Sequence, residues 1–129
     1  MIYIIPLRVP ANTPVEDPVV ATLKLSACII ENVSVEFPRG CYWLVSTRAR
    51  LREVQLYPTN PGEWITSEAG RVEWTDDAAI IDPPYELTIE AYNEDERYPH
   101  TIRWYLDVRE LSPYRVVPGT VSVETAYVG

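Results

Sequence analysis

Few residues of this chain are of the types that perform catalysis. The sequence contains one histidine, His100, in the stretch 98–101, and two cysteines, Cys28 and Cys41. Nucleophilic catalysis by a serine or cysteine needs a histidine base that a carboxylate orients, and neither cysteine stands in a context typical of a reactive thiol. No disulfide framework is visible either. We therefore expect a structural role for His100, two separate buried thiols, and a protein that is not an enzyme.

Carboxylates are the other candidates for catalysis. Glu86 and Glu90 fall on the same face of an extended segment, and glycoside hydrolysis uses two acids that face each other across a cleft. A small domain built from short strands offers no deep cleft. We expect both side chains to be ordinary solvent-facing carboxylates.

Metal binding has only weak candidates. One histidine and two widely separated cysteines do not supply the closely spaced ligands of a zinc site. Oxygen ligands suited to calcium crowd the loop 93–96 and the pair Asp76-Asp77, but the spacing of an EF-hand is absent. Asn93 and Asp95 are the weak calcium candidates, a solvated acidic loop is the alternative, and no cofactor is expected.

Aromatic residues that carry a polar atom are unusually frequent. The chain has four Trp and nine Tyr but one Phe, and such side chains suit protein interfaces or sugar-stacking platforms. Trp43 and Trp104 fall on predicted inner faces, so we expect both in the core. The residues expected to face outward or to lie near turns are Trp64, Tyr57, Tyr92 and Tyr105. The candidate interface residues are Trp64, Tyr92, Tyr105, Tyr114 and Tyr127.

Two alternating segments define the elements that would position these side chains. Residues 85–91 and 102–108 place apolar side chains at every second position, which is the pattern of a strand with one buried face. A polar loop, residues 93–99, separates them. The pattern predicts a β-hairpin around this loop, since neither segment has the spacing of three and four residues that a helix requires.

Similar alternation occurs along the rest of the chain. Residues 19–37 form a long extended segment whose alternation breaks near Glu31, which predicts a bend or bulge there. Residues 71–81 are predicted to form two short strands with a turn at Asp76-Asp77. Twelve Pro and five Gly separate the segments, as all-β domains require.

These strands predict an all-β fold, an antiparallel two-sheet β-sandwich of jelly-roll or immunoglobulin-like type with extended terminal arms. A chain of 129 residues fits one domain. Its parts are an N-terminal strand and Pro-rich arm (1–18), the sandwich domain (19–110), and a C-terminal arm or edge strand (111–129). The proline residues of the first arm favour an extended backbone.

The charge of the chain limits its partners. The formal net charge is −8, and only one lysine, Lys24, stands among the eleven basic residues. Nucleic acids and anionic membranes select clustered Lys and Arg, so we expect neither as a partner. No stretch approaches the twenty or so apolar residues of a membrane span, and residues 1–5 lack the features of a secretion signal.

Several stretches carry a resemblance to a known group of proteins. They are residues 10–14, 37–41, 55–59, 84–95 and 99–102. Together they resemble small β-sandwich structural proteins of tailed phages, of the head decoration or auxiliary capsid type. The resemblance implies assembly on a repeating lattice and carries over no catalytic residues.

We accordingly expect a non-enzymatic virion structural protein, a capsid decoration protein on the outer surface of the particle and otherwise soluble. It would form homo-oligomers, with a trimer favoured, and would contact the major capsid protein or other virion proteins. The arms 1–18 and 111–129 would contact other copies, since an arm can add a strand to an open sheet edge. Two alternatives remain open: a carbohydrate-binding or adhesion module that uses Trp64 or Tyr92, and a calcium-stabilised binding domain.

Overall fold

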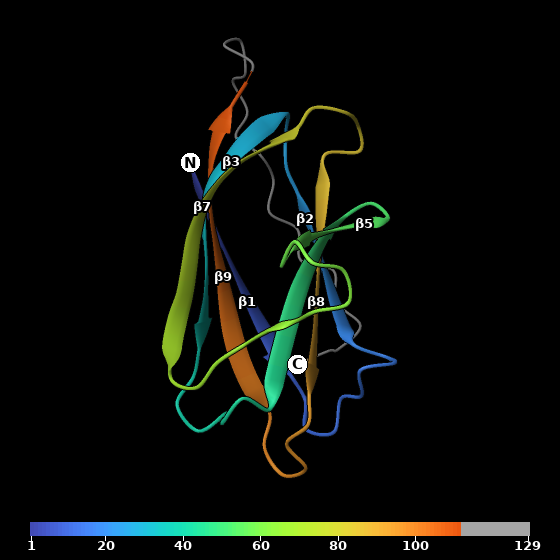
Figure 1. The fold of residues 1–129 in the computed structure, drawn as a ribbon, viewed down its shortest axis with the longest axis vertical. Helices are drawn as coiled ribbons and strands as arrows, with labels where there is room; N and C mark the ends of the chain where they lie inside the picture. The colour runs from blue at the N-terminus through green and yellow to red at the C-terminus, as the bar shows by residue number, and fades with distance from the viewer. Residues whose placement is uncertain (112–129) are drawn as a thin grey trace.

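Two antiparallel sheets face each other in the computed structural model, which describes residues 1–111 (Figure 1). Sheet I contains, in spatial order, β1 (Ile2–Val9), β9 (His100–Glu110), β3 (Cys28–Phe37) and β7 (Gly70–Ile80). Sheet II contains β2 (Val19–Lys24), β8 (Glu86–Asn93), β4 (Val45–Leu51) and β5 (Val54–Tyr57), and the short β6 (Ile65–Thr66) also pairs with β4. The predicted all-β, two-sheet sandwich is confirmed.

The pairing of the strands is nested. β1 pairs with β9, β2 with β8, β3 with β7 and β4 with β5, and all these pairs are antiparallel. The described chain is thus a long antiparallel ribbon, rolled so that successive pairs fall in opposite sheets. This is a jelly-roll arrangement, one of the two sandwich types that the sequence predicted.

β8 and β9 follow each other in the chain but do not form the predicted hairpin. β8 pairs with β2 and β4 in sheet II, whereas β9 pairs with β1 and β3 in sheet I. The loop 94–99 therefore crosses from one sheet to the other. The prediction was wrong because alternation identifies the buried face of a strand and not its partner.

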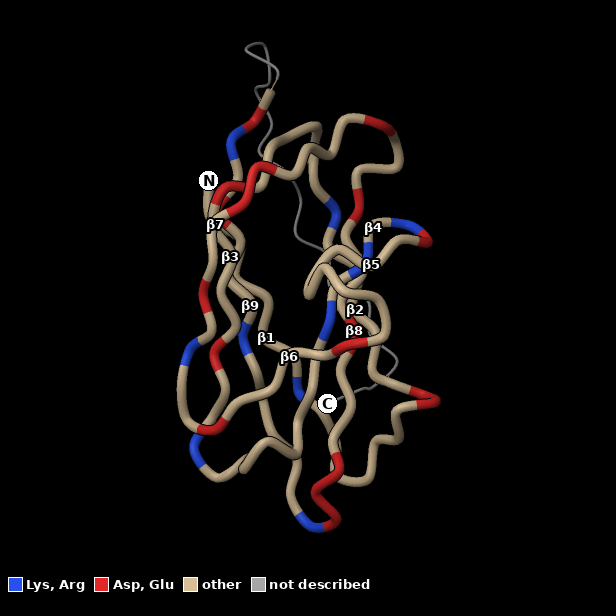
Figure 2. The backbone as a smooth tube through the Cα atoms, in the orientation of Figure 1, with Lys and Arg blue, Asp and Glu red and all other residues tan. Residues whose placement is uncertain are grey.

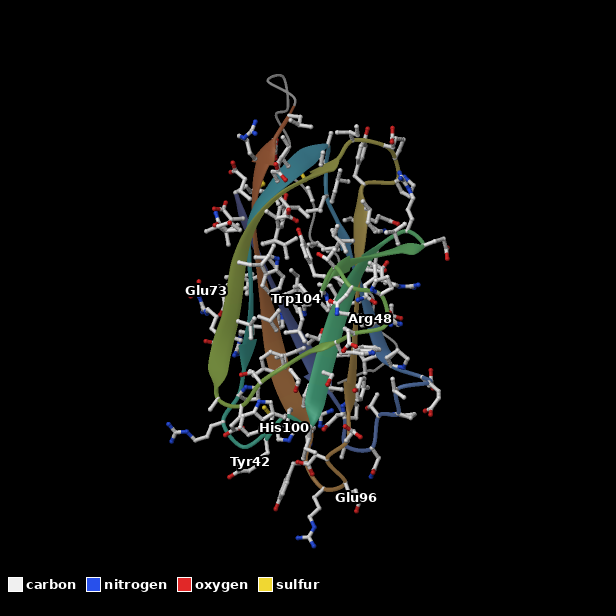
Figure 3. The ribbon with its side chains drawn as sticks, viewed as in Figure 1. Tyr42, Arg48, Glu73, Glu96, His100 and Trp104 are labelled. Atoms are coloured by element: carbon white, nitrogen blue, oxygen red, sulfur yellow. The ribbon has the colours of Figure 1, made fainter. Side chains whose placement is uncertain are left out.

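Both alternating segments bury the faces that the sequence predicted. Leu87 of β8 and Ile102 of β9 are fully buried between the sheets. Trp104 lies at the centre of the sandwich (Figure 3), where its indole Nε1 donates a hydrogen bond to Thr47 Oγ1 at 3.1 Å. The buried indole thus has the acceptor that its N–H requires, and the apolar side chains around it supply the main stabilisation of the fold.

The prediction for Trp43 is wrong, and that for Tyr57 is met in part. Trp43, predicted to lie in the core, is 60% exposed. β4 begins only at Val45, so Trp43 belongs to the preceding turn and does not continue the alternation of the strand. Tyr57, predicted to face outward or to lie near a turn, ends β5 just before a turn but is buried, because its ring packs edge-on against Trp74 of β7 with the centroids 5.2 Å apart.

β7 is one continuous strand and not the two that the sequence predicted. Between Ala78 and Thr75 its register with β3 shifts, so that Asp76 and Asp77 stand opposite the single residue Glu31. The two acidic residues form a β-bulge and not a turn. The irregularity predicted near Glu31 is confirmed, but the chain changes sheet earlier, between β2 and β3.

The N-terminal segment is part of the sandwich and not a free arm. β1 pairs with β9 along its whole length, and Ile5 and Leu7 are fully buried. Pro6 lacks an N–H and is tolerated because β1 is an edge strand. Beyond β1, the backbone N–H of Asn12 donates to the carbonyl of Asp95 at 2.9 Å. Release of β1 would expose buried apolar side chains, and the contact of residues 1–18 with other copies stays a prediction.

The two sides of the sandwich differ. On the side that we call the closed side, edge strand β1 contacts β2 and β8 of sheet II. On the open side, edge strand β7 faces the short β5, and Tyr57 bridges them by donating its hydroxyl hydrogen to Asp76 Oδ2 at 2.6 Å. Beside this bridge, a groove remains open between the two sheets.

Candidate functional site

The most exposed aromatic side chains of residues 1–111 lie in two loops at one end of the sandwich. Tyr42 and Trp43 belong to the β3–β4 loop and Tyr98 to the β8–β9 loop, and they are 66%, 60% and 61% exposed. Figure 3 shows Tyr42 at this end of the molecule, near His100 and Glu96. The loops are in contact, since the N–H of Glu94 donates to the carbonyl of Leu44 at 2.8 Å. We call Tyr42, Trp43 and Tyr98 the aromatic end.

The β3–β4 loop holds two of these residues in an unusual backbone conformation. Tyr42 and Trp43 have φ angles of 46° and 60°, in the left-handed region that costs a residue other than glycine about 1–2 kcal/mol. Gly40, with φ of 93°, adopts positive φ without this cost. Residues kept in such conformations are concentrated at binding and catalytic sites, which makes this loop the first candidate for function.

Glu68 and Cys41 fix the conformation of this loop. The Glu68 carboxylate accepts hydrogen bonds from the backbone N–H groups of Tyr42 at 2.7 Å and Gly40 at 3.2 Å. The bond from Tyr42 is the main cause that lowers the pKa of Glu68. Cys41 is fully buried and its thiol donates to the carbonyl of Ser67, while burial raises the thiol pKa. A loop fixed in this way loses little conformational entropy when it binds a partner.

Asp95 organises the second loop of the aromatic end. Its carboxylate accepts hydrogen bonds from the backbone N–H groups of Arg97 at 2.9 Å and Tyr98 at 3.2 Å, and lies 2.8 Å from His100 Nε2. These bonds, that from Arg97 first, lower the pKa of Asp95. His100 therefore helps to hold the loop together, in agreement with its interpretation as a structural residue.

The weak calcium candidates Asn93 and Asp95 make their contacts within the same loop. Asn93 is fully buried, its side-chain amide donates to the carbonyls of Val9 and Tyr98, and its Oδ1 accepts from the Asp95 N–H. In the part of the chain that the structure describes, no group of three or more His, Cys, Asp or Glu side chains is arranged to hold a metal ion. Both residues thus shape the loop.

Trp64 and Tyr92, two of the predicted interface residues, meet on the outer face of sheet II. Their ring centroids are 4.7 Å apart, and the Arg48 guanidinium lies 4.2 Å above the Trp64 ring. Arg48 also donates to Glu90 Oε1 at 2.8 Å, and Arg50 Nε lies 3.3 Å from the same oxygen. Glu90, expected to face solvent, is buried by these two cations. The guanidinium of Arg48 thus covers one face of the Trp64 indole.

Tyr105, the remaining predicted interface residue within residues 1–111, lies apart from this cluster. Tyr105 lies on the outer face of sheet I, where the Arg71 guanidinium stands 4.5 Å from its ring centroid and its hydroxyl donates to Glu36 Oε1 at 3.4 Å. Tyr114 and Tyr127 fall outside the described residues. Of the three predicted interface residues within residues 1–111, Trp64 and Tyr92 come together and Tyr105 does not join them.

Sequence reasoning missed the aromatic end. It continued the alternation of β4 back through Trp43 and so assigned a turn residue to the core. The available signal was the turn of residues 38–40, Pro-Arg-Gly, which directly precedes Cys41. Such a turn gives no reason to extend strand periodicity into the residues that follow it.

Acidic residues are spread over the surface of the molecule (Figure 2). They include Glu73, Asp76 and Asp77 along β7, and Glu94 and Glu96 in the β8–β9 loop. Together with the net charge of −8, this distribution gives a surface that repels polyanions.

Comparison with known proteins adds no family. A scan against models of protein families finds none that matches this chain, and a search of curated proteins finds no significant relative. The described residues include no helix with the length and apolar character needed to cross a membrane. Function is therefore argued from the residues of the chain itself.

Proposed function

We propose that the protein is a non-enzymatic structural protein of a virus particle, a decoration protein that binds the outer surface of the shell and associates with copies of itself. The aromatic end binds the shell, with the major capsid protein as the first candidate partner. The C-terminal segment, residues 112–129, holds the copies together.

The aromatic end is the observation that carries this proposal. Exposed apolar surface that is gathered in one place is typical of interaction sites, and Tyr and Trp are the residues that most often dominate binding energy at protein interfaces. The loop that presents Tyr42 and Trp43 is fixed in advance by Glu68. Projecting loops suit docking against a protein surface better than enclosing a small molecule.

Charge and sequence resemblance support an outer position. An acidic surface is repelled by packaged nucleic acid, so the protein suits the outside of a shell better than the inside. The stretches that resemble phage decoration proteins include residues 37–41, which lead directly into the aromatic end.

The fold supports the proposal more weakly. Jelly rolls recur in viral capsid proteins, and they also occur in lectins. A fold by itself does not set a function, so the jelly roll is compatible with a particle role and does not establish one.

Binding to purified shells tests the proposal. Shells of the virus that encodes the protein, freed of it, are mixed with the wild type or with Trp43→Ala and then sedimented. Loss of a central interface aromatic commonly costs 2 kcal/mol or more, so we expect the affinity to fall about thirtyfold. Val54→Ala, which changes an exposed side chain of β5, is the matched control and should bind as the wild type does.

Two results would contradict the proposal. One is equal binding by Trp43→Ala and the wild type. The other is the absence of the protein from purified particles when their proteins are identified by mass spectrometry.

The carbohydrate-binding alternative keeps one supporting observation. The exposed rings of Tyr42 and Trp43 have the residue types of sugar-stacking platforms. Glycan-array signals that disappear in Trp43→Ala would assign the aromatic end to a glycan instead of a shell protein.

A further inference from the structure

β7 presents an open sheet edge. It pairs with β3 on one side, and no strand among residues 1–111 pairs with its other side. An edge strand exposes unpaired N–H and C=O groups, which are a template for a further strand. β7 contains no proline, and its residues Gly70–Thr75 keep a regular register with β3. This stretch is therefore suited to accept another strand.

The bulge of β7 limits where pairing can occur. Beyond Thr75 the register shifts at Asp76 and Asp77, and the Asp76 carboxylate is turned toward Tyr57 across the open side. Bulges and inward-pointing charges both discourage pairing at a sheet edge. An added strand would thus end at the bulge.

An apolar groove lies beside the open edge. It has a volume of about 340 Å³, and its walls include Tyr57, Pro58, Ile65, Val72 and Trp74. Among residues 1–111, the buried indole Nε1 of Trp74 has no hydrogen-bond partner, and Trp74 forms part of the groove wall.

The sequence beyond the described residues supplies a segment of matching pattern. Residues 120–127 alternate, with Val121, Val123 and Tyr127 on one side and mostly polar residues on the other. A strand with one apolar side is the occupant that the groove requires. Residues 112–119 connect this segment to β9 and, when extended, span roughly 25 Å.

β9 ends with β3 between it and the open edge of β7. Cys28 pairs with both Glu110 and Ile80, so β9 and β7 end at the same end of the sandwich. The N–H of Leu111 donates to the carbonyl of Ala27 at 3.1 Å and continues the line of β9, which projects past its neighbours (Figure 1). To reach its own β7, the chain would have to turn back across β3. A neighbouring copy beyond this end receives the segment without that turn.

We propose that residues 120–127 of one copy add as a strand to Gly70–Thr75 of β7 in a second copy, with their apolar side in the groove beside Trp74. This inference rests on the self-association named in the proposed function and identifies the edge and the segment that produce it. A head-to-tail contact of this kind closes into a ring when the rotation between copies allows it, as the expected trimer requires.

Sedimentation velocity of the full chain tests the inference. Val72→Lys places a charge in the groove, and its half-buried position lets the long side chain reach solvent. The double variant Val121→Lys/Val123→Lys places charges on the apolar side of the segment. We expect the wild type to assemble and each of these variants to sediment as the 14.8 kDa monomer at the same concentration.

Matched controls separate a specific contact from a general effect of charge. Ile4→Lys adds the same charge to an exposed side chain of the other edge strand, β1. Thr120→Lys/Ser122→Lys adds two charges to the opposite side of the segment. Both controls should assemble as the wild type does, and circular dichroism should show that all the variants keep their strands.

A mixture of the two monomeric variants shows whether the contact is between copies. Val72→Lys retains the segment and Val121→Lys/Val123→Lys retains the edge, so the mixture should form mixed dimers. The inference is overturned if the wild type is monomeric or if either variant assembles normally. It is equally overturned if the mixture stays monomeric, because the segment then does not bridge copies.

The test for binding to virus particles and the sedimentation test of self-association can fail independently of each other. A protein that is absent from particles but shows the expected exchange of segments would overturn the proposed function alone. A particle protein whose variants assemble normally would overturn this inference alone.

Discussion

The closed and open sides of the sandwich both carry an edge strand of sheet I, but they are built differently. On the closed side, β1 buries Ile5 and Leu7 completely, contacts sheet II and contains Pro6. On the open side, β7 has no proline and leaves Val72 and Trp74 half-buried beside a groove. Proline is one of the features that keep sheet edges from pairing. One edge is thus protected, and the other has the features that strand addition would require.

The largest difference between the two sides should be in the unfolding free energy lost when an inward-facing side chain of each edge strand is truncated. Leu7→Ala removes a fully buried side chain and should cost about 3 kcal/mol of unfolding free energy. Val72→Ala removes less volume from a site already open to solvent, so we expect about 1 kcal/mol or less. Urea unfolding at concentrations where the protein is monomeric gives both values. Equal losses would show that the open side is as well packed as the closed side.

The bridge across the open side should contribute less. Tyr57→Phe removes the hydroxyl that donates to Asp76 Oδ2 and leaves the ring packed on Trp74. We expect a loss of about 1 kcal/mol, typical of one hydrogen bond. Urea unfolding of Tyr57→Phe beside Tyr92→Phe, which changes a tyrosine of the outer face, measures the loss that is specific to the bridge. No loss would mean that this contact does not hold β5 to β7.

Asp95 in the β8–β9 loop, whose carbonyl accepts from the Asn12 N–H near the end of β1, should make the smallest contribution to stability. The contribution should change only at acidic pH. The pKa of Asp95 is lowered in the folded state by N–H donors and His100. Its stabilising contribution is therefore complete above the ordinary aspartate pKa of about 4 and is lost as the pH falls through the lower folded value. Melting temperatures between pH 6 and pH 2 should fall less steeply for Asp95→Asn than for the wild type. Parallel curves would contradict this role of Asp95.

Sequence alone predicted the sandwich because alternation reports burial directly. The side chains of β8 and β9 that alternate in the sequence, Leu87 and Ile102 among them, are the ones that lie between the sheets. The same signal failed for strand partners, because a strand buries the same face whichever neighbour it pairs with. It also failed at Asp76-Asp77, where two charges within a strand look like a turn.

The candidate site was harder to predict than the fold. Trp64 and Tyr92 were predicted to face outward or to lie near turns, and their rings meet edge-on with the centroids 4.7 Å apart. Tyr42 and Trp43 were missed because their exposure depends on two left-handed backbone residues and on the distant Glu68. Neither cause leaves a periodic signal in the sequence.

Hydrogen exchange along β7 tests the central claim most directly. A chain that ends at Leu111 keeps every core side chain that the structure describes, since these lie between Tyr3 and Val108, so it can be compared with the full chain at a concentration where the latter assembles. We expect the outward-facing amides of Gly70–Thr75 to exchange at least about tenfold more slowly in the full chain, while the amides of β1 exchange equally in both. Identical exchange along β7 in the two chains would contradict the account.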